Sequence, residues 1–202
     1  FHHLVRTVPS EGCLVVNGAE ASLERVLERG AWSPVARFGI DTNNTWSMQP
    51  HPNDDFTVMH EGKEVATVHW APDSGVMGRH NQLNALAAIA AAQHIGISPR
   101  DAASALAQFK NVKRRLETVG QHNGITIYDD FAHHPTAITT TLDGLRRRVG
   151  KARILAVLEP RSNTMKLGIM KAQLPASLET ADRIYAYGAA SGKEALGWNL
   201  AD

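Results

Sequence analysis

Three short apolar runs separated by helical patterns limit the fold more than any other feature of the sequence. The runs are Ile125 to Tyr128, Ile154 to Leu158 and Arg183 to Tyr187, and the helical patterns cover residues 136–148 and 165–182. Strands that alternate with helices are typical of an α/β architecture with a parallel sheet. Ligands bind such sheets beyond the carboxyl ends of the strands. Asp129-Asp130 and Glu159-Pro160-Arg161 follow two of these strands, so we expect a binding site there.

The first half of the chain predicts a different order of elements. We expect strands at Cys13 to Asn17, Val35 to Ile40 and, as an antiparallel, half-exposed hairpin around Glu61-Gly62-Lys63, at Phe56 to Trp70. Helices are expected at Ser22 to Arg29, at Asn81 to His94, and after a Ser98 cap with Pro99 in the first turn. A basic segment follows, and we place a domain boundary near residue 111, giving domains 1–110 and 111–202.

Composition excludes several classes of protein. The 202 residues carry 21 basic and 20 acidic side chains, so no global charge attracts nucleic acid or anionic membranes. Cys13 stands alone, which favours a reducing, cytoplasmic compartment, and no run reaches the roughly 18 apolar residues of a membrane helix. The chain begins at Phe1 without a signal-peptide pattern, and we expect the natural protein to start upstream.

Two groups of residues near the domain boundary could bind a nucleotide. Asn81 and Asn84, within Gly78 to Asn84, are spaced to share a helical face, where their amides could meet a purine edge. The alternative is helix capping by Asn81. Arg114 and Arg115 could hold a polyphosphate bidentately and couple domain closure to nucleotide binding, or could form a solvated surface.

The segment Tyr128 to Thr136 follows a predicted strand and opens a helix. A carboxylate there could accept from ribose hydroxyls, and a histidine could bind an anion or orient a substrate. The structural alternatives are an aspartate cap and a helix start at Pro135, with the histidines on the surface. A divalent metal is a further alternative, although no closed ligand spacing supports it; its ligands would be Asp129, Asp130, His133 and His134.

The segment Leu158 to Lys166 follows another predicted strand and is rich in polar side chains. Such a cluster suits the carboxylates of a small substrate; its members are Arg161, Ser162, Asn163 and Lys166. The alternative is a polar loop capped by Ser162 or Asn163.

Taken together and in this order, the four motifs resemble the Mur ligase family of ATP-dependent amide-bond ligases. The family pattern G-x-H-N-x-x-N with an Ala-rich helix is similar to Gly78 to Ala92, the linker arginine pattern to Phe109 to Glu117, and D-Y-x-H-x-P to Asp130 to Pro135, where Phe131 replaces the tyrosine. The sequence LEPRSNTMKLG, Leu158 to Gly168, resembles the members that attach a recycled tripeptide to UDP-N-acetylmuramate.

The resemblance implies an α/β fold that comprises the end of a central ATPase domain, residues 1–110, and an incomplete Rossmann-like C-terminal domain, residues 111–202. The sequence holds no G-x-x-x-x-G-K-[ST], because Gly62-Lys63, Gly150-Lys151 and Gly192-Lys193 are not followed by Ser or Thr. We therefore expect ATP and Mg²⁺ to be needed, with the Mg²⁺ ligands mostly upstream, and the fragment alone to be inactive. The oligomeric state stays open.

The resemblance also implies roles for the residues. Asn81 and Asn84 would lie at adenine, Asp130 at ribose with Asp129 a weaker candidate, and Arg114 or Arg115 at the phosphates. The tripeptide side would comprise His133, Arg161, Ser162, Asn163 and Lys166. Three alternatives stay open: a UDP-N-acetylmuramate–L-alanine ligase, a metal-dependent phosphoesterase built on the Asp and His cluster, and a non-catalytic nucleotide-binding module.

Overall fold

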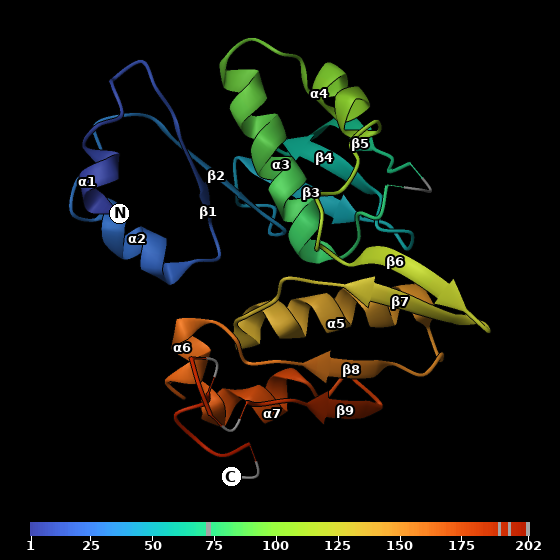
Figure 1. Cartoon of the computed structure of the whole chain (residues 1–202). Coiled ribbons are helices and arrows are strands. Elements are labelled where there is room, and N and C mark those ends of the chain that lie inside the picture. The colour runs from blue at the N-terminus through green and yellow to red at the C-terminus, as the bar shows by residue number, and fades with distance from the viewer. Residues whose placement is uncertain (72–73, 190, 194, 201–202) are drawn as a thin grey trace. The chain divides into compact units, whose positions relative to one another are not determined.

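The computed structural model of the chain describes residues 1–71, 74–189, 191–193 and 195–200 (Figure 1). Contacts between Cα atoms divide the chain into two compact units, Phe1–Lys110 (unit 1) and Asn111–Asp202 (unit 2). Helices and strands are mixed in both units, as expected for an α/β fold.

A mixed sheet organises unit 1. Its strands lie in the order β1 (Leu14–Asn17), β2 (Val35–Gly39), β3 (Trp46–Pro50), β4 (Phe56–His60) and β5 (Lys63–Val68). β1, β2 and β3 run parallel, whereas β3, β4 and β5 form an antiparallel meander. The expected hairpin is confirmed, with Glu61 and Gly62 at φ of 49° and 77° in its turn. β4 begins with three buried residues, so the hairpin is less exposed than expected.

Two of the helices of unit 1 pack on this sheet. α3 (Arg79–His94) lies against β1, β2 and β3, and α4 (Pro99–Leu106) lies against β5 (Figure 1). Leu86 and Ile89 of α3 are 0% and 1% exposed and pack in the core with Phe56. The Ser98 cap of α4 is confirmed, because its Oγ accepts from the Asp101 backbone N–H at 3.1 Å. The remaining helices of the unit are α1 (His2–Val5) and α2 (Ala21–Leu27).

Unit 2 begins with a hairpin that the sequence analysis did not predict. β6 (Glu117–His122) pairs antiparallel with β7 (Ile125–Asp129). The turn between them is Asn123-Gly124, and both residues have positive φ, 48° and 77°. Asn-Gly is the preferred sequence for such a turn because both central residues must adopt positive φ.

The rest of unit 2 contains α5 (Pro135–Val149), β8 (Leu155–Leu158) and β9 (Arg183–Ala186), and β8 and β9 run parallel. The single helix expected over residues 165–182 is wrong. The segment instead holds α6 (Asn163–Lys166), η1 (Lys171–Gln173) and α7 (Leu174–Ser177). Gly168, at φ of 71°, interrupts the helical pattern, and Pro175 fits only the first turn of a new helix. Across the described residues, every helix falls short of the length and apolar character that crossing a bilayer requires.

The expected parallel sheet of unit 2 is present only in part. Within the described residues, β7 pairs with β6 and β8 pairs with β9, but β7 and β8 do not pair with each other. Apolar side chains on both strands stay exposed: Ile125 by 57%, Ile127 by 51% and Val157 by 80%. Unit 2 therefore leaves an open space between two pieces of sheet.

Candidate functional site

A cleft of about 1170 Å³ runs between β7, α5 and β8 of unit 2. Its apolar part is lined by residues of these three elements, among them Ile127, Leu142 and Val157. Its polar part lies where β7 and β8 end, as expected for a parallel α/β arrangement. Several of the residues singled out in the sequence line this one cleft: Arg114, Asp130, His133, Arg161 and Ser162.

The Asp130 carboxylate is half-buried at the end of β7 and ties three segments together. Its Oδ2 accepts from the Leu116 backbone N–H at 2.8 Å. Its Oδ1 accepts from the Ala132 backbone N–H at 2.8 Å and from the Thr141 hydroxyl at 3.3 Å. A carboxylate has about four lone-pair sites, so Asp130 retains acceptor capacity for a further hydroxyl. Sequence reasoning found Asp130 but gave no sign of its partners, which come from the linker and from the middle of α5.

Arg114 is held over the end of β7. Its Nε lies 3.3 Å from Asp129 Oδ2, and its guanidinium carbon lies 5.1 Å from the centre of the Phe131 ring. Its backbone carbonyl accepts from the Phe131 N–H at 2.8 Å, and its φ is 60°. Because the side chain is 57% exposed, its contacts with Asp129 and with the Phe131 ring each contribute no more than about 1 kcal/mol. An anion could therefore draw the guanidinium away at small cost.

The other polar residues around β8 and the linker either make local contacts or are exposed. Ser162 caps α6, because its Oγ accepts from the Met165 N–H at 3.3 Å, which confirms the capping alternative for this residue. Lys166 donates from Nζ to the Lys193 carbonyl at 3.0 Å. Asn163 and Arg115 are exposed, and neither is among the residues that line the cleft.

The two histidines have separate local roles. Nδ1 of His133 lies 3.0 Å from the Phe131 carbonyl oxygen, and its ring is exposed. His134 is the N-cap of α5, and its Nδ1 accepts from the Thr136 N–H at 3.2 Å. The helix therefore starts at Pro135 as one alternative predicted, but a histidine rather than an aspartate caps it.

Metal binding by this cluster finds no geometric support. Among the described residues, no group of three or more His, Cys, Asp or Glu side chains is arranged to hold a metal ion. His134 is turned toward the start of α5, and both oxygens of Asp130 accept backbone N–H groups.

Asn81 and Asn84 belong to unit 1 and lie in the first two turns of α3. The N-cap of the helix is Gly78, with φ of 86° and no side-chain cap, so the expectation that Asn81 caps the helix is wrong. Asn81 instead donates from Nδ2 to the Met77 carbonyl at 2.8 Å. Asn84 is exposed about one turn further along the helix.

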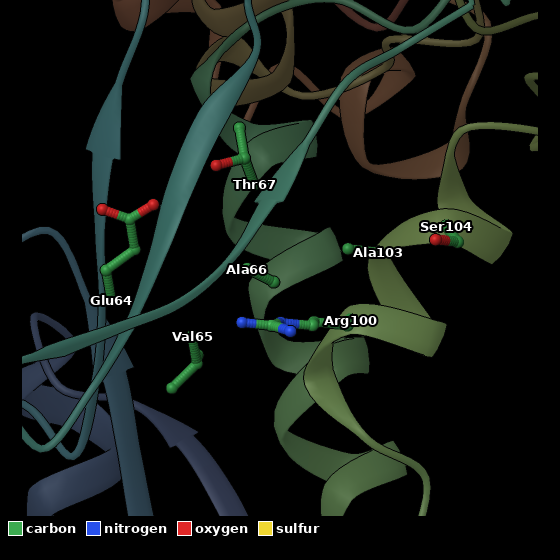
Figure 2. A pocket seen from close by; sticks show the side chains of 7 residues that line it. All are labelled: Glu64, Val65, Ala66, Thr67, Arg100, Ala103 and Ser104. Carbon is green, nitrogen blue, oxygen red and sulfur yellow. The ribbon is translucent and has the colours of Figure 1, made fainter.

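A second hollow, of about 570 Å³, lies between β5 and α4 of unit 1. Figure 2 shows the Arg100 side chain reaching from α4 toward β5, near Ala66. The lining holds one cation, Arg100, and one carboxylate, Glu64, so it carries no net charge, and it contains none of the residues singled out in the sequence. The unit 2 cleft is therefore the better candidate site.

Comparison with known proteins agrees with this architecture. The family model of the Mur ligase middle domain matches residues 1–92, and the model of the Mur ligase, glutamate ligase domain matches residues 114–202. The two matches together span most of the chain and define an α/β protein built from two Mur ligase domains. The chain belongs to the Mur ligase family.

Particular relatives are similar over nearly the whole chain. The UDP-N-acetylmuramate–L-alanyl-γ-D-glutamyl-meso-2,6-diaminoheptandioate ligase of Haemophilus influenzae is 47% identical over 100% of this chain and 43% of its own length. The ligase of the same name from Escherichia coli is 47% identical over 92% of this chain and 40% of its own length. A crystal structure of a murein peptide ligase from Psychrobacter arcticus has 44% identity and a TM-score of 0.67, covering 93% of this chain and 39% of that one. The chain thus spans about two fifths of the length of these relatives.

Proposed function

We propose that the protein is an ATP-dependent amide-bond ligase that joins UDP-N-acetylmuramate to the tripeptide L-alanyl-γ-D-glutamyl-meso-diaminopimelate. Two relatives of that name, each 47% identical, support the substrate pair. The observation that carries the proposal is the cleft in unit 2, where Arg114, Asp130, His133, Arg161 and Ser162 come together at the ends of two strands. A cytoplasmic location belongs to the same proposal.

The reaction would proceed in two steps. The muramoyl carboxylate attacks the γ-phosphorus of ATP, the bond to the β-phosphate oxygen breaks, and ADP leaves. The peptide α-amine then attacks the acyl carbon, inorganic phosphate leaves, and the amine loses a proton. Both steps develop charge on phosphoryl oxygens, which cations and Mg²⁺ stabilise when they are already in place.

The residues of this chain would bind and orient the reactants. Asn81 and Asn84 would contact adenine, Asp130 a ribose hydroxyl, and Arg114 or Arg115 the phosphates. The spare acceptor capacity of Asp130 and the weakly held guanidinium of Arg114 support these two assignments. The carboxylates of the tripeptide would face His133, Arg161, Ser162, Asn163 and Lys166. We assign residues 1–110 to the end of the ATP-binding middle domain and residues 111–202 to the C-terminal ligase domain.

The main alternative substrate is free L-alanine. UDP-N-acetylmuramate–L-alanine ligases are also relatives; that of Lawsonia intracellularis is 36% identical over 79% of this chain. The lower identity favours the tripeptide over L-alanine.

The test measures phosphate release by the gene product that carries this sequence. UDP-N-acetylmuramate and ATP are supplied with either the tripeptide or L-alanine. We expect kcat/KM to be at least about 100-fold higher with the tripeptide, since several charged groups are recognised only there. A preference for L-alanine would replace the proposed substrate, and release with neither would remove the ligase proposal.

A further inference from the structure

The turn that joins β3 to β4 is fixed by a buried carboxylate. Asp55 is 7% exposed. Its Oδ1 accepts from the Trp70 backbone N–H at 3.0 Å, and its Oδ2 accepts from Asn53 Nδ2 at 2.9 Å and lies 2.7 Å from His69 Nδ1. One side chain thereby ties the turn, residues 51–55, to the end of β5.

The charged form of Asp55 is favoured where it lies. Burial alone would raise the pKa of this carboxyl, but the hydrogen bonds from His69, Trp70 and Asn53 outweigh burial and hold the pKa below its ordinary value. An ionised carboxylate accepts stronger hydrogen bonds than a neutral group does. The turn is therefore rigidly anchored.

The anchored turn presents two backbone carbonyls toward α3. Asp54 has a φ of 64°, a left-handed conformation that is uncommon outside glycine. Its carbonyl oxygen accepts from Trp70 Nε1 at 3.0 Å and from Gln82 Nε2 at 2.9 Å. The Asp55 carbonyl also accepts from Gln82 Nε2, at 3.2 Å. The unusual backbone conformation places both carbonyls within reach of one side-chain amide.

Gln82 is the residue whose side-chain amide donates to these two carbonyls. It is 3% exposed, and it lies in the first turn of α3 between Asn81 and Asn84. Glycine at the N-cap gives the helix no side-chain cap. The first turn is instead tied down by the Gln82 amide on one side and by the bond from Asn81 Nδ2 to the Met77 carbonyl on the other.

We propose that Gln82 is a positioning residue, which fixes the first turn of α3 on the Asp54-Asp55 turn and so sets the direction in which Asn81 and Asn84 point. The proposal rests on the proposed function in one respect, because it takes the base of the nucleotide to be what these two asparagines meet. Gln82 itself does not contact the nucleotide.

The first experiment needs no ligand. Gln82→Met keeps the length of the side chain and removes its donor, and Gln93→Met makes the same change at an exposed position near the other end of α3. Amide hydrogen exchange is measured by NMR on the whole chain. We expect exchange of the amides of residues 83–86 to rise about tenfold in Gln82→Met, which corresponds to about 1.4 kcal/mol, and to stay unchanged in Gln93→Met. Equal exchange in both variants would overturn the proposal.

The second experiment tests the direction of the asparagines. Binding of ATP and of GTP to the gene product that carries this sequence is followed through the side-chain amide signals of Asn81 and Asn84. We expect the ratio of ATP affinity to GTP affinity to fall at least about fivefold in Gln82→Met and to be kept in Gln93→Met, since a general loss of stability would weaken both nucleotides alike. A ratio kept in Gln82→Met would overturn the positioning role. If the unchanged gene product shows no response to either nucleotide, the nucleotide assignment fails, and the exchange experiment alone decides whether Gln82 fixes the turn.

Discussion

Asp55 in unit 1 and Asp130 in unit 2 perform the same local task in different surroundings. Each carboxylate contacts three donor groups and joins a connecting segment to another part of its unit. Asp55 is buried within a five-stranded unit, whereas Asp130 is half-buried at the rim of an open cleft. Burial makes a hydrogen-bonded carboxylate a structural anchor, and partial exposure leaves it able to bind a ligand.

We expect the largest difference between the two carboxylates in the unfolding free energy that is lost when each is replaced by alanine. Asp55→Ala removes a buried acceptor of three hydrogen bonds, including that from the Trp70 N–H, so we expect unit 1 to lose about 2–4 kcal/mol of unfolding free energy. Asp130→Ala should cost unit 2 about 1 kcal/mol or less, because Asp130 is half-buried at the rim of the cleft, where water can take the place of the carboxylate. Urea titrations followed by the amide NMR signals of each unit measure both values. Equal losses of unfolding free energy in the two variants would contradict the view that only Asp55 is a structural anchor.

Substitutions at the same two positions should have the opposite order of effect on the KM for ATP. In the gene product that carries this chain, we expect Asp130→Ala to raise the KM for ATP about tenfold, through a lost acceptor for ribose. The more conservative Asp55→Asn should change that KM much less at a temperature where it stays folded. An unchanged KM in Asp130→Ala would remove the ribose assignment.

The next largest effect should be on kcat/KM for the tripeptide, when a positive charge after β8 is removed. Arg161 lines the cleft, whereas Lys166 is not among its lining residues and donates to the Lys193 carbonyl. Arg161→Ala should lower kcat/KM for the tripeptide about tenfold or more, since a hydrogen bond to a charged group contributes about 1.5–3 kcal/mol. Lys166→Ala should lower it less, and the KM for ATP should stay constant in both. A larger loss of kcat/KM in Lys166→Ala than in Arg161→Ala would indicate that the peptide binds outside the cleft.

A smaller effect should appear in the dependence of unit 1 stability on pH. The pKa of Asp55 is lowered by folding, so its ionised form stabilises unit 1 above the ordinary value of 3.8, and that contribution is lost as the pH falls through the lower folded value. Acid titration of unfolding free energy should therefore be flatter in Asp55→Asn than in the unchanged chain. In unit 2, hydrogen bonds from the Ile154 N–H and Arg146 lower the pKa of Asp182, so Asp182→Asn is the matched variant there. An acid transition with the same slope in Asp55→Asn would contradict the role of the anchor.

The smallest effect is expected at Phe131. Phe131→Leu removes the ring beneath the Arg114 guanidinium but keeps an apolar side chain. A cation–π contact at an exposed site contributes about 0.5–1 kcal/mol, so ATP affinity should fall about two- to fivefold in Phe131→Leu. Phe131→Tyr keeps the ring and should leave the affinity unchanged, as calorimetric titration would show. A full loss of affinity in Phe131→Leu would mean that Phe131 contacts the nucleotide itself.

Sequence patterns predicted the elements whose signal is local. The hairpin of β4 and β5, the helix α3 and the cap of α4 follow from alternation, alanine content and a Ser-Pro start. β6 was missed because its residues are mostly polar, although Asn123-Gly124 offered a turn signal. β3 was missed because Trp46, Ser47 and Met48 are all buried, so its buried residues do not alternate with exposed ones.

The candidate site was predictable in its residues but not in their contacts. Asp130 and Arg161 follow strands, and that position marks them in the sequence. The contacts of Arg114 with Asp129 and Phe131 depend on the linker adopting positive φ at Arg114 and Leu116, for which the sequence gives no glycine signal. Gln82 was missed because nothing in its neighbourhood predicts two carbonyl partners 28 and 27 residues away.

The meander of β3, β4 and β5 also implies an order in which the elements of unit 1 form during folding. These strands are consecutive in the chain and pair with their sequence neighbours, whereas α3 meets the sheet across longer separations. Contacts between near neighbours close small loops and form early in folding. We therefore expect the Asp54-Asp55 turn to exist before α3 docks, so that the nascent helix finds its two acceptor carbonyls already in position.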